Sequence, residues 1–118
     1  MAAAAIAMLL SIHLGAYSAV FTFSGAPSTV RASYTSKPLV QCGSGLPVAV
    51  RGVHFVVRFF PARSAPSLSK PTLAGAGALR GLAKTCDFES DLTWAIGLDR
   101  RRPYHLARHG ARVTVTFG

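Results

Sequence analysis

The chain has 118 residues, with 13 Lys and Arg against 4 Asp and Glu, and its formal net charge is +9. This length allows one domain at most, and because the sequence contains no Asn, N-glycosylation is excluded. The positive charge favours anionic partners such as nucleic acid, acidic lipid headgroups or an acidic protein surface, without identifying one of them.

The N-terminal segment is long and uncharged. Residues 2–23 read AAAAIAMLLSIHLGAYSAVFTF, and no Asp, Glu, Lys or Arg precedes Arg31. A helix of about 22 residues at ~1.5 Å per residue spans roughly 33 Å, close to the ~30 Å hydrocarbon thickness of a bilayer. The nearby positive charges, Arg31, Lys37 and Arg51, all follow the segment, and the positive-inside rule keeps that side in the cytosol. Residues 1–26 therefore predict a single-pass membrane anchor with its N-terminus outside.

Two alternatives involve removal of the N-terminus. The apolar core at residues 2–14 and the small-residue pattern before Ala19 resemble a cleaved signal peptide, although the positive n-region is missing. The Ser- and Thr-rich stretch 24–36, within an acid-free run that reaches Thr85, resembles a plastid transit sequence. Either alternative describes a secreted or organelle-targeted basic protein.

Beyond this segment, linkers alternate with two strand signals. Residues 27–47 are rich in Ser, Thr, Gly and Pro and predict a linker, as do the three prolines among serines in 61–71. Residues 48–60 (VAVRGVHFVVRFF) are mostly β-branched and aromatic, which predicts a strand or short hairpin. Residues 112–117 (RVTVTF) alternate apolar and polar side chains and predict a strand that could pair with it.

Two helices are predicted between these strands. Residues 72–84 contain three glycines and form at best a weak helix. Residues 87–98 (DFESDLTWAIGL) start with a good N-cap aspartate, and Phe88, Leu92 and Ile96 recur at four-residue spacing. The sequence therefore predicts no defined fold, but an N-terminal apolar helix followed by a largely disordered or weakly folded α+β region at residues 48–118.

The two cysteines, Cys42 and Cys86, form one disulfide if this region is in an oxidising compartment. Such a bond closes a loop of about 45 residues and stabilises the fold by ~3–4 kcal/mol. In a cytosolic setting both thiols stay reduced.

No catalytic, cofactor or metal motif is found. Gly75, Gly77 and Gly81 fit neither a dinucleotide fingerprint nor a Walker loop. His105 and His109 supply only two of the four ligands of a structural zinc site. All four carboxylates fall between positions 87 and 99, where helix capping explains them. An enzyme is therefore not expected, and no cofactor is predicted.

The strongest candidate site is a basic cluster near the C-terminus. It consists of Arg100, Arg101, Arg102, Arg108 and Arg112, with Tyr104 among them. Guanidinium groups bind phosphates bidentately, so residues 100–112 predict a surface for nucleic acid or anionic lipid. The alternative is a solvated tail without a partner. No biochemical activity follows. The predicted protein is small, basic and membrane-anchored through residues 2–23; the alternatives are a processed basic protein or the product of a little-selected GC-rich reading frame.

Overall fold

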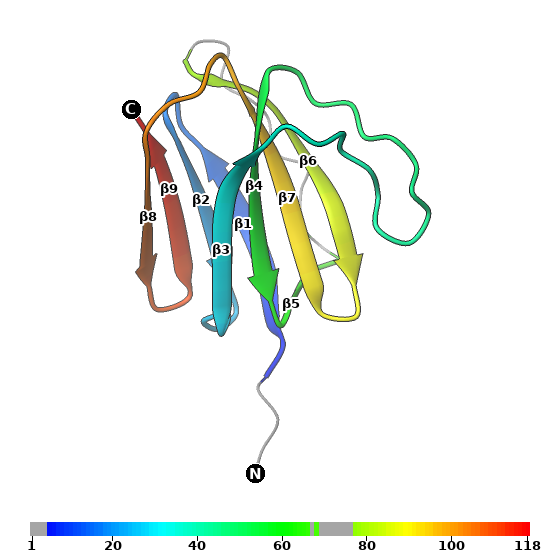
Figure 1. Ribbon diagram of the computed structural model, residues 1–118. Helices are drawn as coiled ribbons and strands as arrows, with labels where there is room; N and C mark the ends of the chain where they lie inside the picture. The colour runs from blue at the N-terminus through cyan, green and yellow to red at the C-terminus, as the bar shows by residue number, and fades with distance from the viewer. Residues whose placement is uncertain (1–4, 67, 69–76) are drawn as a thin grey trace.

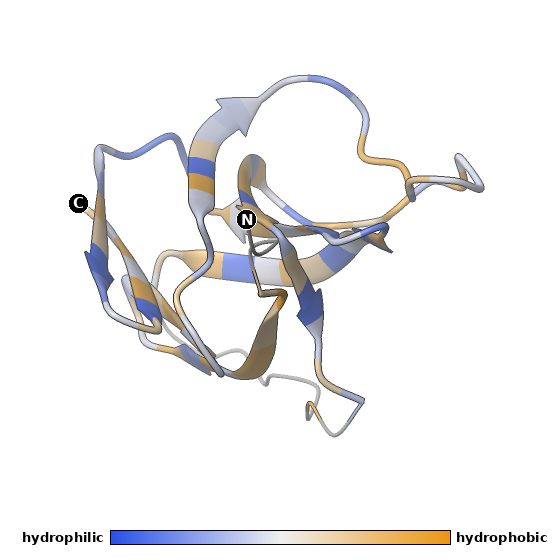
Figure 2. Ribbon diagram, turned by 90° about the horizontal axis from the view of Figure 1, so that it is seen from below, coloured by the Kyte–Doolittle hydropathy of each residue, from blue (hydrophilic) through white to orange (hydrophobic). Residues whose placement is uncertain are grey.

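Nine β-strands and no helix make up the secondary structure of the described residues, which are 5–66, 68 and 77–118 of this computed structural model (Figure 1). The strands in chain order are β1 (Ala7–Leu14), β2 (Ser18–Phe23), β3 (Thr29–Thr35), β4 (Val53–Phe60), β5 (Ala62–Ser64), β6 (Leu79–Phe88), β7 (Asp91–Leu98), β8 (Tyr104–His109) and β9 (Arg112–Phe117). Along several strands hydrophobic and hydrophilic residues alternate, as Figure 2 shows by colour. A period of two is the pattern of a strand with one face against a core.

The strands form two sheets that pack face to face. Sheet A has the order β5-β1-β2-β9-β8, and sheet B has the order β3-β4-β7-β6. Neighbouring strands are antiparallel except β1 and β5, which are parallel. Figure 1 looks onto the outer face of sheet B, with β1 and β2 behind it.

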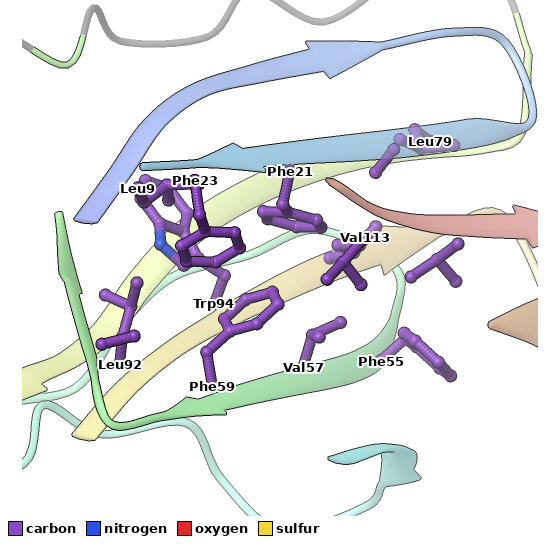
Figure 3. Packing of buried hydrophobic residues seen from close by; sticks show 14 of the residues in the cluster. Leu9, Phe21, Phe23, Phe55, Val57, Phe59, Leu79, Leu92, Trp94 and Val113 are labelled. Atoms are coloured by element: carbon purple, nitrogen blue, oxygen red, sulfur yellow. The ribbon is translucent and has the colours of Figure 1, made fainter. Parts of the chain in front are cut away.

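The core lies between the two sheets and is rich in aromatic rings. Phe59 of β4 contacts Phe21 and Phe23 of β2, with ring centroids 5.0 and 4.8 Å apart. Toward the other end, Phe55 of β4 meets Phe117 of β9 at 5.1 Å. Figure 3 shows the rings of Phe21, Phe23 and Phe59 converging from both sheets. Burial of large apolar side chains at ~1.5–3 kcal/mol each is the main stabilising contribution of this layer.

The predicted membrane helix over residues 2–23 is wrong, because its described part supplies β1 and β2. Residues 2–4 lie outside the described residues. In β2, Ala19 and Phe21 are fully buried two positions apart. In β1, Leu9 is fully buried, and a register shift between Leu9 and Ser11 leaves Ser11 and His13 exposed. The uncharged stretch is therefore apolar because it enters the protein core. In the described part of the chain, no helix has the length and apolar character that a membrane span requires. The predicted single-pass topology and signal-anchor are wrong for the same reason.

The predicted α+β and disordered character is also wrong. Residues 87–98 form most of the β6–β7 hairpin, whose two turn residues, Glu89 and Ser90, have φ of 50° and 66°. Positive φ at both central residues is the requirement of a tight hairpin turn that matches strand twist. The predicted linker at 27–47 is not entirely a linker, because strand β3 lies within it. Of the predicted weak helix at 72–84, residues 72–76 lie outside the described residues, and the rest from Leu79 belong to β6.

Both predicted strands exist, but they do not pair with each other. Residues 53–60 form β4, between β3 and β7 in sheet B. Residues 112–117 form β9, between β2 and β8 in sheet A. The two segments thus face each other across the core, which explains why both present apolar side chains on one face.

A long loop between β3 and β4, residues 36–52, is called the strap here. It crosses sheet B near Gly97, where a Cβ atom on this residue would lie 1.9 Å from the carbonyl oxygen of Arg51, so only glycine allows the approach. The Cys42–Cys86 disulfide ties the strap to β6, and the Cys42 amide donates to the carbonyl of Thr85 at 3.0 Å. The strap thereby covers the edge of β6, which otherwise presents unpaired backbone groups.

We expect the neighbours Phe59 and Phe60 to differ sharply in their effect on stability. Phe59 is fully buried, whereas Phe60 is 43% exposed. Phe59→Ala should lower the free energy of unfolding by about 3–5 kcal/mol because it removes a buried ring and leaves a cavity. Phe60→Ala should change it by about 0.5 kcal/mol or less. Urea denaturation of both variants measures the difference, and equal effects would contradict the assigned register.

Removal of the disulfide should loosen the strap and weaken the fold. Replacing Cys42 and Cys86 by Ser opens a covalent loop of 44 positions. The chain-entropy model gives a loss of about 4 kcal/mol for a loop of this size. The measurement is denaturation of the double variant and of the wild type, each with and without reductant. If reductant also lowers the free energy of unfolding of the double variant, the loss of stability does not come from the disulfide.

A basic and aromatic groove as candidate functional site

An open groove lies where the loop between β7 and β8 crosses from sheet B to sheet A. Its lining residues are Tyr34, Arg101, Arg102, Pro103 and Tyr104, and its volume is about 500 Å³. The loop begins directly after β7 and ends at the first residue of β8, while Tyr34 comes from β3 at the edge of sheet B. The groove therefore spans the seam between the edge strands of the two sheets.

Tyr34 and Tyr104 are held as fixed rings at this seam. Both pack against the core residue Phe55, with ring centroids 5.0 and 4.7 Å away. The hydroxyl of Tyr34 donates to the carbonyl of Arg102 and accepts from the Arg102 amide at 2.8 Å, and the Tyr104 hydroxyl donates to the carbonyl of Ala32 at 3.2 Å. Tyr104 nevertheless keeps 44% of its surface exposed. The rings thus offer a preorganised aromatic surface to a ligand.

Of the two arginines that line the groove, one is paired within the protein. Arg102 binds Asp99 bidentately, with Nε to Oδ1 at 2.9 Å and Nη2 to Oδ2 at 2.8 Å. The hydrogen bonds from Arg102 are the main cause that lowers the pKa of Asp99 to about 2. Arg102 also lies 5.3 Å above the ring of Tyr17, so it fixes the loop rather than facing a ligand.

Arg101 is the cation that the groove presents. Its guanidinium carbon lies 4.9 Å from the centroid of the Tyr34 ring. None of the ion pairs among the described residues includes Arg101, and its side chain is exposed. A guanidinium held over a ring binds a carboxylate or phosphate with little loss of side-chain freedom. The arrangement is suited to binding a ligand that combines an anionic group with a flat or apolar face.

The structure divides the basic cluster that the sequence suggested. Arg100, Arg101 and Arg102 share the β7–β8 loop, but Arg108 near the end of β8 and Arg112 at the start of β9 lie at the opposite end of sheet A. Six positions along a strand amount to about 20 Å. Arg108 donates to the carbonyl of Pro27 instead of joining the groove.

Sequence reasoning missed Tyr34. It lies 68 positions before Arg102, and no local pattern links the two residues. Tyr104 stands out in the sequence as an aromatic residue within the basic run, but its role beside Tyr34 depends on the seam between the sheets. Among the described residues, no three His, Cys, Asp or Glu side chains gather as a metal site would require.

Fold and site together define a small disulfide-linked β-sandwich with an open groove. The chain matches the AMIN-like domain over residues 13–116 and therefore belongs to this family. No curated protein and no solved structure is significantly similar to it. The family match extends from within β1 to within β9 and includes every residue of the groove.

The Asp99–Arg102 pair should titrate at unusually low pH. A depressed pKa means that the interaction is fully present above the ordinary value of 3.8 and is lost as the pH falls through about 2. Carboxyl chemical shifts recorded by NMR should therefore give Asp99 a midpoint near 2. In an Arg102→Gln variant the midpoint should return toward 3.8, and an unchanged midpoint in that variant would contradict the pairing.

Proposed function

We propose that this chain is a non-catalytic binding domain of the cell envelope and that it binds peptidoglycan through the groove of Tyr34, Arg101 and Tyr104. The observation that supports this most is the free guanidinium of Arg101 beside two fixed tyrosine rings. Peptidoglycan offers both complementary features, because its sugar rings have apolar faces and the peptides attached to them carry carboxylates.

Family membership supports the same conclusion. Domains of the AMIN-like family are typically periplasmic and bind peptidoglycan. The Cys42–Cys86 disulfide is consistent with an oxidising compartment outside the cytosol. A periplasmic or secreted location also fits the high net charge of +9, since an anionic cell-wall polymer attracts a basic domain.

The groove works by preorganised recognition. Arg102 and Asp99 hold the loop, so that Arg101 is fixed over Tyr34 before a ligand arrives. A ligand carboxylate then binds Arg101 while a sugar ring lies against the exposed face of Tyr104. Because the groove is open along the seam, it accommodates one part of a long polymer rather than enclosing a whole small molecule.

Binding should depend on the groove more than on total charge. Arg101→Gln should weaken binding to purified insoluble peptidoglycan by about 10-fold or more, since a charge-assisted hydrogen bond contributes ~1.5–3 kcal/mol. Tyr104→Ala should weaken it through loss of the stacking surface. Co-sedimentation of the folded variants with peptidoglycan measures both effects.

Arg112→Gln is the matched control, because it removes the same charge from an exposed position on β9, away from the groove. Its binding should stay within about twofold of the wild type, given the weak contribution of a screened surface charge. Equal losses in Arg101→Gln and Arg112→Gln would contradict the groove as the site. Single-stranded DNA, added as a competitor, should not displace the domain from peptidoglycan at equal anion concentration.

A further inference from the structure

A second surface with exposed aromatic rings lies on the outer face of sheet B, and we call it the outer patch. It consists of Arg31, Arg58, Phe60, Phe88 and Asp91. In the strand register, Phe59 pairs with Leu92 and Phe88 pairs with Asp91. Phe60, Asp91 and Phe88 therefore stand in one row across β4, β7 and β6. Two strand spacings separate the two phenylalanines, which is about 10 Å.

Both rings are open to solvent. Phe88 is 62% exposed and Phe60 is 43% exposed. At the other end of the same face, the strap lies against the sheet at Gly97. Figure 1 shows the strap at the upper end of sheet B, whereas β4 and β6 end at the lower end. The outer patch thus lies on this face away from the place where the strap contacts it.

An ion pair lies between the rings. Arg58 donates from Nε to both carboxylate oxygens of Asp91, at 2.9 and 3.0 Å, and its Nη2 lies 2.7 Å from Oδ2. Asp91 also raises the pKa of Arg58 through these hydrogen bonds. The pair is fixed by neighbouring strands, so it presents polar groups at a defined position between Phe60 and Phe88.

The outer patch carries an excess positive charge. Arg31 and Arg58 are direct cross-strand partners, an arrangement in which like charges repel. Asp91 compensates Arg58, but none of the ion pairs among the described residues includes Arg31. An anionic group bound beside Arg31 would relieve this repulsion.

We propose that the outer patch is a second site for the sugar chain of peptidoglycan and its acidic peptides, which makes the domain bivalent for this polymer; the choice of ligand rests on the function proposed above. Two rings separated by an ion pair fit a saccharide, which has apolar faces and hydroxyl groups along its edges. A hydrophobic peptide requires a continuous apolar surface instead. A carboxylate of the peptide attached to the saccharide binds Arg31.

The two sites are separate but close enough to act on one polymer. Tyr34 of the groove and Thr29, which pairs with Phe60 beside the outer patch, both belong to β3. Five positions along this strand correspond to about 17 Å. Two linked sites on one wall polymer raise the apparent affinity without any new contact, because the second binding event becomes intramolecular.

The test uses the full chain with soluble peptidoglycan fragments and with insoluble peptidoglycan. In an NMR titration with the fragments, amide shifts should move in two groups, one around Arg101 and Tyr104 and one around Arg58 and Phe88. Phe60→Ala/Phe88→Ala should abolish the second group and leave the first unchanged. The same double variant should bind insoluble peptidoglycan at least 10-fold more weakly.

Val40→Ala/Leu46→Ala is the matched control, because it removes two exposed hydrophobic side chains, 47% and 64% exposed, from the strap. Its binding should equal that of the wild type. Shifts confined to the groove would overturn the second site and leave the proposed function intact. If neither group moves, both proposals fail. Shifts around Phe88 that depend on protein concentration alone would assign the outer patch to self-association and overturn the saccharide site.

Discussion

The fold depends on the burial of two apolar sheet faces against each other, with Phe59 placed between Phe21 and Phe23 at its centre. An antiparallel sheet with one apolar face is not stable alone in water, so each sheet requires the other. This requirement explains why the N-terminal segment contains no charged residue. Strand β2 lies between β1 and β9 in the middle of sheet A, and charged side chains on its inner face would be costly to bury.

The same two-layer arrangement creates the groove. A chain that passes from sheet B to sheet A must cross the open seam between their edge strands, and the β7–β8 loop does so at β3. Its arginines are therefore brought to Tyr34, whose hydroxyl fixes the loop through the backbone of Arg102. One arginine is used for structure by pairing with Asp99, and Arg101 remains available to a ligand.

The sequence predicted a strand correctly where apolar and polar residues alternate strictly. It predicted a helix wrongly where the spacing of apolar residues fits both a helix and a strand. The strict alternation of Val113, Val115 and Phe117 predicted β9 correctly. The spacing of Leu92 and Ile96 by four positions fits a helix, but four is also an even number, so it fits a strand equally well. Trp94, buried between them, and Leu98, buried two positions after Ile96, distinguish the strand. Tyr34 could not be assigned to the site, because only the tertiary fold brings it to Arg102.

Backbone amide hydrogen exchange on the full chain tests the central claim most directly. If residues 18–23 form the middle of sheet A, the backbone amides of Ala19, Phe21 and Phe23 should exchange as slowly as those of Leu92 and Ile96, since all lie in one cooperative core. Loss of protection should be simultaneous for both sheets in denaturant. Rapid exchange in residues 7–23 beside slow exchange in β7 would contradict the account, because the N-terminal segment would then lie outside the folded domain.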